Sequence, residues 1–117
     1  MDEEMDDAST SLTLRAIQAR VDTWISQWDE GYWSPHANLA RLTEEVGELA
    51  REINDVHGPK TKKADEPEGR ISDELADILF VVVTIANSLD IDLETAFERA
   101  MDKYDVRDAQ RWTKTED

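Results

Sequence analysis

The sequence has no cysteine and few cations: 13 lysines and arginines stand against 28 aspartates and glutamates, a formal net charge of -15. Without cysteine the chain has neither a disulfide framework nor a thiolate metal ligand, which fits a reducing compartment, and we expect the cytoplasm. The negative charge argues against nucleic acid polymers and anionic membrane surfaces as partners. A divalent cation is a more natural companion.

Long apolar runs are also missing. No segment approaches the roughly 20 apolar residues that a membrane-spanning helix needs. The first residues are acidic, whereas a secretory signal begins basic and then becomes apolar. We therefore expect a soluble, unexported protein of 117 residues with one domain at 11–112. Residues 1–10 are predicted to be a disordered acidic lead-in, and 113–117 a short tail.

Four segments of the domain have the apolar spacing of amphipathic helices. They cover approximately residues 11–28, 34–56, 72–89 and 93–104. Ser34, Ser72 and Asp92 are suitable N-caps, and residues 58–69, rich in proline and glycine, form a connection. The sequence therefore predicts an all-α, four-helix bundle-like fold. The β-branched run at 80–85 also suits a buried strand, but the flanking DELADIL and ANSL extend the segment beyond usual strand length.

The apolar residues of these helices predict where packing occurs. The second helix has an apolar stripe opposite a charged face: Leu39, Leu42, Val46, Leu49 and Ile53. The third is apolar on every side from Leu79 to Val83, so it should be central and should need additional cover from another subunit. Trp24 and Trp28 are predicted to lie in the core or a subunit interface, although either could border a base pocket.

Two pairs of carboxylates do not look like ordinary surface charge. Glu45 and Glu48 lie about 60° apart on the second helix, and Glu74 and Asp77 repeat this spacing directly before the most apolar stretch. Each pair alone is better explained as a solvated charge pattern. Four carboxylates on facing helices would repel one another, and divalent cations such as Mg²⁺ would remove that cost. Glu52, one turn further, is predicted to be surface.

The carboxylates have the order E-E-x-x-E, then 25 residues, then E-x-x-D, in LTEEVGELAREI and DELADILFVVV. This order resembles the signature of the MazG-like, all-alpha nucleoside triphosphate pyrophosphohydrolases, and the likeness extends from about Trp33 to Trp112. It is closest to the short, single-domain members. The resemblance implies a homo-oligomer, dimer or tetramer, that hydrolyses ribo- or deoxynucleoside triphosphates to monophosphate and pyrophosphate. Such an enzyme would serve in house-cleaning of the nucleotide pool.

The resemblance also implies roles for the carboxylates. Mg²⁺, with Mn²⁺ as an alternative, would bind at Glu45, Glu48, Glu74 and Asp77. Glu44, the first glutamate of the doubled pair, would help to hold a second metal or orient water, and Glu44 or Glu45 would be the catalytic base. The motif contains no histidine and no serine or cysteine nucleophile, which favours attack by a metal-activated water on the α-phosphorus.

Six further residues are predicted to bind substrate: Trp33, His36, Asn87, Lys103, Tyr104 and Arg107. Lys103 and Arg107, with Arg111, are spaced four apart, so one helix side would present cations to a triphosphate, and Tyr104 would add a hydroxyl. These cations could equally pair with the neighbouring aspartates. Asn87 is either a helix cap or, as the family comparison favours, a substrate contact.

Trp33 could stack on a base, and His36 could hydrogen-bond to its edge. Two other functions remain open from the residues alone. One is a non-catalytic helical adaptor stabilised by a bound metal, and the other is a module that binds nucleotides without cleaving them. Metal-dependent melting without turnover would indicate the adaptor.

Overall fold

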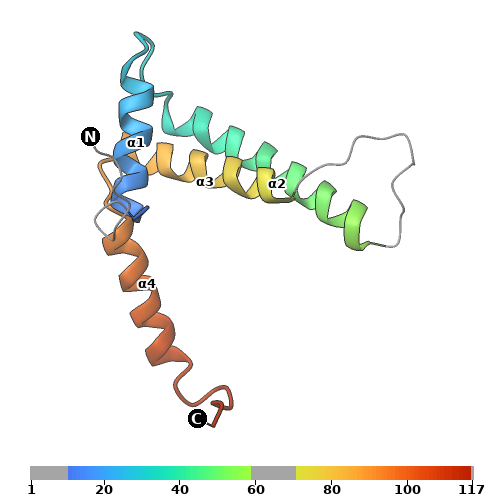
Figure 1. The fold of residues 1–117 in the computed structure, drawn as a ribbon. Coiled ribbons are helices and arrows are strands. Elements are labelled where there is room, and N and C mark those ends of the chain that lie inside the picture. Colours follow the sequence, from blue (N-terminus) through green and yellow to red (C-terminus); the bar gives the residue numbers. More distant parts are fainter. Residues whose placement is uncertain (1–10, 59–70, 117) are drawn as a thin grey trace.

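The computed structural model describes residues 11–58 and 71–116. Within them the chain forms four helices and no strand: α1 (Leu14–Ser26), α2 (Pro35–His57), α3 (Ile71–Ser88) and α4 (Leu93–Arg107) (Figure 1). The all-α prediction is confirmed, and the alternative of a strand at 80–85 is wrong because these residues lie within α3. The predictions for residues 1–10 and 59–69 lie outside the described residues. Among the described helices, none is both long and apolar enough to cross a membrane.

Side-chain caps fix where three of the helices begin. The hydroxyl of Thr13 accepts a hydrogen bond from the Ala16 amide at 3.0 Å, and that of Ser34 accepts one from the Ala37 amide at 3.2 Å. Asp92 caps α4 through the amide of Glu94. The caps at positions 34 and 92 agree with the sequence. The cap predicted at Ser72 is wrong, because α3 already begins at Ile71.

The turn between α3 and α4 is a Schellman motif. Asp90 has a φ of 57°, in the left-handed region, and the Ile91 amide donates to the Ala86 carbonyl at 2.8 Å. The Asp90 amide donates to the carbonyl of Asn87, which completes the motif. The turn therefore ends α3 abruptly and starts α4 in a new direction.

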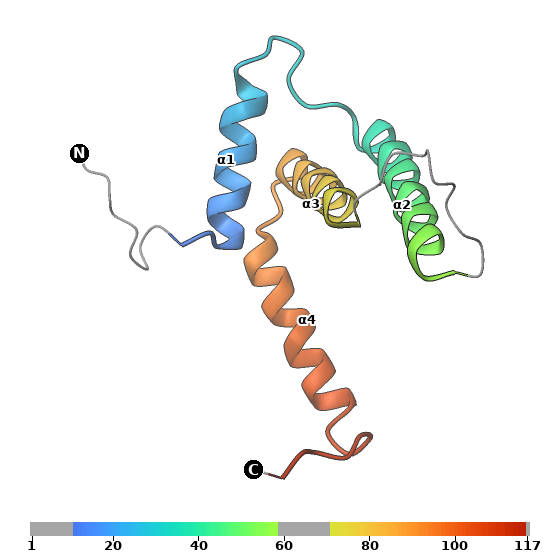
Figure 2. The same cartoon turned by 45° about the vertical axis from the view of Figure 1, so that its right-hand side comes forward.

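Helix α3 is the central element, as its all-round apolar sequence predicts. It lies between α1 and α2 (Figure 2) and packs against both. The core forms where α1 crosses the C-terminal half of α3, around the buried side chains Val21, Ile25 and Val83. Half-buried Phe80 and Tyr32 pack against this cluster, so the core borders the site described below.

Helix α2 turns a largely polar face toward α3. Asn38 is buried, and Arg41 and Glu45 are half-buried on the same side of the helix. Three residues of the predicted apolar stripe are instead exposed: Leu39 (56%), Val46 (48%) and Ile53 (41%). Burying polar groups while exposing apolar ones is unfavourable unless the polar groups have a ligand and the apolar ones have a cover. The polar side of α2 is therefore a candidate ligand site, and its exposed apolar side is a surface that needs cover.

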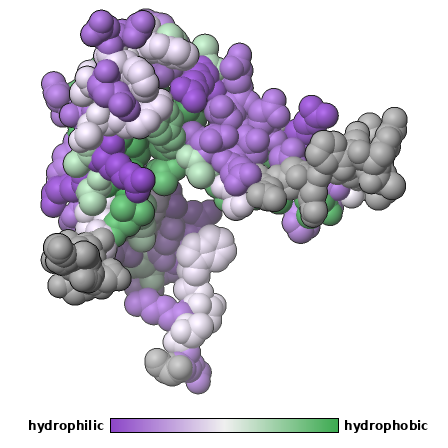
Figure 3. All heavy atoms as spheres, turned by 45° about the horizontal axis from the view of Figure 1, so that its top comes forward, coloured by the Kyte–Doolittle hydropathy of each residue, from purple (hydrophilic) through white to green (hydrophobic). Residues whose placement is uncertain are grey.

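Helix α4 extends away from the α2–α3 pair. It packs against α1, and both ribbon views show it diverging from the pair (Figures 1 and 2). The radius of gyration is 18.6 Å, against about 13 Å for a compact chain of ~100 residues. In Figure 3, apolar residues, coloured green, are visible at the surface where α4 and the α2–α3 pair diverge. The four helices therefore do not close into a bundle within one chain.

Candidate functional site

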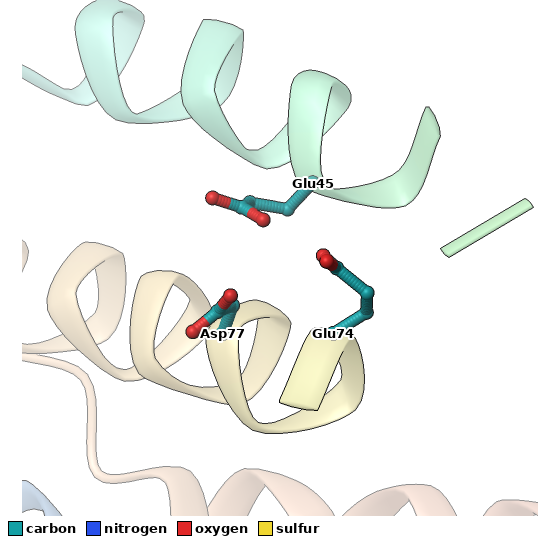
Figure 4. A group of neighbouring side chains, drawn as sticks. All are labelled: Glu45, Glu74 and Asp77. Atoms are coloured by element: carbon teal, nitrogen blue, oxygen red, sulfur yellow. The ribbon is translucent and has the colours of Figure 1, made fainter. Parts of the chain in front are cut away.

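Three carboxylates from two helices converge between α2 and α3. Each of Glu45, Glu74 and Asp77 offers one oxygen, and these oxygens all lie within 4.8 Å of one another. Figure 4 shows Glu45 reaching down from α2 toward the two side chains of α3. Carboxylate oxygens at this spacing are the donor set that a hard divalent cation prefers.

The negative charge of Glu74 is destabilised by burial and by the neighbouring carboxylates. Its oxygen Oε1 is buried and accepts no hydrogen bond from a described residue. Burial raises the pKa of Glu74 above its usual value, and the hydrogen bond and charge of Glu45 raise it further. The charges of Asp77 and Glu48 act in the same direction. A buried carboxylate oxygen without a donor is what a cation ligand looks like without its cation, so the residues present fit a divalent metal.

The other glutamates of the motif lie at the margin of this group. Glu48 is exposed one turn beyond Glu45 and outside the three-residue group, although its charge still acts on Glu74. Glu44 is exposed and also outside the group. Glu52, predicted to be surface, is half-buried on the side of α2 that faces α3. The structure thus brings together three of the four predicted ligands and places the fourth close by.

An aromatic pocket of about 340 Å³ adjoins the carboxylates. Its aromatic lining comes from α1, the following turn and α3: Trp24, Trp28, Tyr32, Trp33 and Phe80. Trp24 meets Trp28 and Phe80 edge to face, with ring centroids 6.0 and 5.9 Å apart. A partly apolar cavity of this size, lined by rings, suits a planar heterocycle.

The turn between α1 and α2 shapes one wall of the pocket. Gly31 has a φ of 66°, a left-handed conformation that glycine adopts without strain. The hydroxyl of the next residue, Tyr32, donates to Asp22 Oδ1 at 2.6 Å. Burial raises the pKa of Tyr32, and the hydrogen bond to Asp22 adds to this rise. The tyrosine is therefore held in place from α1.

Polar side chains also line the pocket. The buried Asn38 donates a 3.4 Å hydrogen bond to the Trp33 carbonyl, and the buried Thr84 donates to the Phe80 carbonyl at 2.8 Å. Arg41 places its guanidinium carbon 5.8 Å from the ring centroid of Trp33 and 5.5 Å from that of Phe80. Aromatic rings with a few polar groups between them are typical of pockets that orient a ligand.

The pocket and the carboxylate group follow one another along the same pair of helices. On α2 the pocket residue Arg41 precedes Glu45 by one helical turn, and on α3 Asp77 precedes the pocket residue Phe80 by about one turn. A ligand that occupies both places would therefore lie along the α2–α3 pair. Its ring would fill the aromatic pocket, and its negatively charged groups would meet a cation held by the carboxylates.

Asn87 does not face this pocket. Its amide nitrogen donates to the Gln18 carbonyl at 3.0 Å, and its amide oxygen accepts from Gln18 Nε2 at 2.8 Å. Gln18 also accepts from the Leu93 amide. Both polar atoms of Asn87 are thus used to join α1, α3 and the start of α4, and its contact with substrate stays a prediction.

The predicted cations of α4 also lie apart from the carboxylates of the same chain. Lys103 Nζ and the guanidinium carbon of Arg107 lie 5.3 and 5.0 Å from the ring centroid of Tyr104. Arg107 and Arg111 both pair with Asp108, at 3.0 and 3.4 Å. These pairs agree with the alternative that the cations serve the end of the helix.

Of the two predicted base contacts at the start of α2, only Trp33 lines the pocket; His36 is exposed and does not. Trp24 and Trp28 were predicted to lie in the core or a subunit interface, with a place beside a base pocket as the alternative; both are about half exposed and line the pocket. Asn38 and Arg41 were not predicted to belong to the site. Their signal was present, because they continue the spacing of Glu45 and Glu48 toward the start of the helix, three and four residues apart on one face.

Comparison with known proteins adds an independent finding. Residues 33–112 match the family model of the MazG nucleotide pyrophosphohydrolase domain. The protein YpjD of Bacillus subtilis strain 168 is 54% identical over 105 residues, which cover 90% of this chain and 95% of YpjD.

Two crystal structures are similar to this chain over most of its length. That of YpjD from Bacillus subtilis has a TM-score of 0.74 at 54% identity, covering 81% of this chain and 97% of its own. That of a Bacillus-conserved MazG protein, a nucleotide pyrophosphohydrolase, has a TM-score of 0.71 at 48% identity, covering 87% of this chain and 99% of its own. The likeness therefore extends well beyond the carboxylate motif.

Proposed function

Because the chain belongs to the MazG nucleotide pyrophosphohydrolase family, we propose that it hydrolyses nucleoside triphosphates to the monophosphate and pyrophosphate with Mg²⁺. Membership makes it a hydrolase of acid anhydride bonds in nucleotides. The triphosphate, the metal and the attacked phosphorus are the parts that we propose. A role in clearing unwanted nucleotides from the cytoplasmic pool follows from this reaction.

The observation that carries the proposal is the adjacency of two unlike sites. The carboxylates of Glu45, Glu74 and Asp77 lie next to an aromatic pocket on the same helix pair. A nucleoside triphosphate has the matching parts, since its base is a planar ring and its phosphates bind divalent cations. Neither a protein partner nor a simple metal-stabilised adaptor would need the aromatic pocket at that position.

The metal belongs with the three convergent carboxylates, with Glu48 as a fourth ligand from the exposed side. Mg²⁺ bound there, or Mn²⁺ in its place, would polarise phosphate oxygens and lower the pKa of a coordinated water. The Oε1 atom of Glu74, which is buried and accepts no hydrogen bond from a described residue, supports such a ligand role. Mg²⁺ retains several waters and usually takes only a few protein carboxylates, which this set provides.

The side chains of the site have separate tasks under this proposal. Glu45, or the exposed Glu44 directly before it, takes a proton from the attacking water, because the motif contains no histidine to act as the base. Trp33, with the other rings of the pocket, stacks on the base and excludes water from one end of the nucleotide. The hydrolysis breaks the bond between the α-phosphorus and the oxygen that leaves with pyrophosphate.

We also propose that the chain assembles as a homo-oligomer. Apolar side chains are exposed on both helices of the α2–α3 pair, including Val46 on α2 and Leu75 and Leu79 on α3. Exposed apolar area of this extent is unfavourable in water unless a second surface covers it. A second copy would also bring its own α4, and with it Lys103, Tyr104 and Arg107, toward a site that α4 of the same chain does not reach.

Light scattering tests the assembly. We expect a dimer or tetramer for the wild type and dissociation for Leu79→Glu, which puts a charge into the apolar surface. The exposed Gln110→Glu is the matched control and should leave the mass unchanged. A monomeric wild type at micromolar concentration would contradict the assembly, but it would leave the proposed reaction open.

A panel of ribo- and deoxynucleoside triphosphates, incubated with Mg²⁺ or Mn²⁺ and separated by chromatography, tests the reaction. We expect monophosphate and pyrophosphate in equal amounts. Asp77→Asn should lower kcat by more than about 100-fold, whereas Glu98→Gln on α4 should not change it. Formation of diphosphate and orthophosphate would contradict the proposal. Binding without turnover would indicate a nucleotide-binding module, and metal-dependent melting alone would indicate an adaptor.

A further inference from the structure

Arg41 forms no ion pair in the described part of the chain, whereas three other arginines do. Those pairs involve Arg15, Arg107 and Arg111. Arg41 makes no ion pair or side-chain hydrogen bond with any residue in 11–58 or 71–116. In a protein with 28 acidic residues, a half-buried arginine without a carboxylate partner is available for a ligand.

The two rings beside Arg41 hold its guanidinium group in position. The group lies over the rings of both Trp33 and Phe80, within 5.8 and 5.5 Å of their centroids. Such a cation–π contact needs no hydrogen bond, so the N–H groups of Arg41 can still donate to a ligand. Arg41 is therefore oriented without using up its hydrogen-bond donors.

The position of Arg41 lies between the two parts of the site. It lines the aromatic pocket, and its Cα is about 6 Å along α2 from that of Glu45, one helical turn. A nucleotide with its base in the pocket and its phosphates at the metal-binding carboxylates would pass this turn. The phosphate nearest the nucleoside is the group that passes there.

We propose that Arg41 binds the α-phosphate of the nucleotide, donating two parallel hydrogen bonds to its non-bridging oxygens. The inference rests on the proposed function for the substrate class and adds a specific contact to it. A guanidinium fork suits this contact because its geometry matches a phosphate, whereas an ammonium acts as a point charge. Arg41 would distinguish a nucleotide from a nucleoside before any metal binds.

Calorimetry without divalent cations tests this contact independently of turnover. The probes are the four deoxynucleosides and their 5′-monophosphates, titrated into the full chain in EDTA. We expect the wild type to bind at least one monophosphate more tightly than its nucleoside. Arg41→Gln should weaken that monophosphate by about 10- to 100-fold and the nucleoside by no more than about 3-fold. Arg51→Gln, an exposed arginine further along α2, is the control and should change neither.

Arg41→Lys keeps the charge without the fork, and we expect an intermediate loss for the monophosphate with the nucleoside unchanged. This variant decides the question if Arg41→Gln does not fold, as judged by circular dichroism. Equal weakening of monophosphate and nucleoside would overturn the proposal, because Arg41 would then be only a wall of the pocket. So would unchanged binding of both, or a wild type that does not prefer the monophosphate. Failure of the proposed function would instead appear in the product panel as absent or different products.

Discussion

A carboxylate oxygen of Glu45 on α2 lies within 4.8 Å of a carboxylate oxygen of Glu74 on α3. Two like charges across a helix interface oppose the packing of these helices. Burial is the largest cause of the raised pKa of Glu74, and the hydrogen bond and charge of Glu45 raise it further. The same pair becomes favourable once a cation lies between the oxygens. The helix pair that carries the site is therefore expected to be less stable without metal than with it.

Thermal melting should show this dependence. We expect Mg²⁺ to raise the melting temperature of the wild type, since a ligand at 100 times its Kd stabilises the folded state by about 2.7 kcal/mol, or several degrees. Glu45→Gln should melt at or above the wild type without metal, because it removes a repulsive charge. With Mg²⁺ it should gain little.

Ionic strength must be matched with potassium chloride, because salt alone screens exposed charges. Glu98→Gln, an exposed carboxylate on α4, serves as the control and should respond to Mg²⁺ as the wild type does. An equal rise in Glu45→Gln and wild type would place the responsible metal somewhere other than between α2 and α3.

Trp33 should contribute to binding of the base. Stacking of a base on an aromatic ring contributes about 1–3 kcal/mol, so Trp33→Ala should raise KM by roughly 5- to 100-fold with a smaller effect on kcat. Trp112→Ala is a matched control, because Trp112 is also exposed (67%, against 55% for Trp33) and also lies under an arginine, at 5.0 Å. Equal effects of the two substitutions would argue against a base at Trp33.

Asp92 should make stability depend on pH in the acid range. The hydrogen bond from Arg15 lowers the pKa of Asp92 below 3.8, and the bond from Thr95 lowers it further. A carboxylate with a depressed pKa in the folded state stabilises the fold above its usual pKa and loses that contribution as pH falls through the folded value. The wild type should therefore lose stability below about pH 3.8 relative to Asp92→Asn, which keeps an N-cap but cannot ionise.

Urea unfolding of both proteins from neutral to strongly acidic pH measures this difference. The free energy of unfolding of the wild type should exceed that of Asp92→Asn by the largest amount at neutral pH, and this excess should shrink in the acid range. Glu74 acts with the opposite sign, since its raised pKa means that protonation of the folded state adds stability as pH falls. Glu74 is common to both proteins, so the comparison isolates Asp92. A difference that stays constant with pH would contradict the role given to the Asp92 charge.

Much of the fold was predictable from local sequence. Ser34 before Pro35 fixes the start of α2, and Asp92 fixes that of α4, because capping depends on a few adjacent residues. The spacing of Glu45 with Glu74 and Asp77 was equally readable, since helical periodicity puts each residue on a definite face. The convergence of these three side chains is in line with that reading.

The direction of packing was less predictable. The sequence of α2 has an apolar stripe, yet Leu39 and Val46 are exposed while Asn38 and Arg41 face α3. Periodicity defines the faces of a helix but not which neighbour each face meets, and a functional polar face competes with the apolar one for the interior. The course of α4 was unpredictable for a related reason, because it follows from the turn at Asp90 and not from the apolar stripe of α4.

Hydrolysis in water enriched in oxygen-18 tests the central claim most directly. The triphosphate that the panel identifies is incubated with the enzyme and Mg²⁺, and the products are analysed by mass spectrometry. Attack of water on the α-phosphorus predicts one heavy oxygen in the nucleoside monophosphate and none in the pyrophosphate. Heavy oxygen in pyrophosphate, or in orthophosphate released beside a diphosphate, would contradict the account of this site.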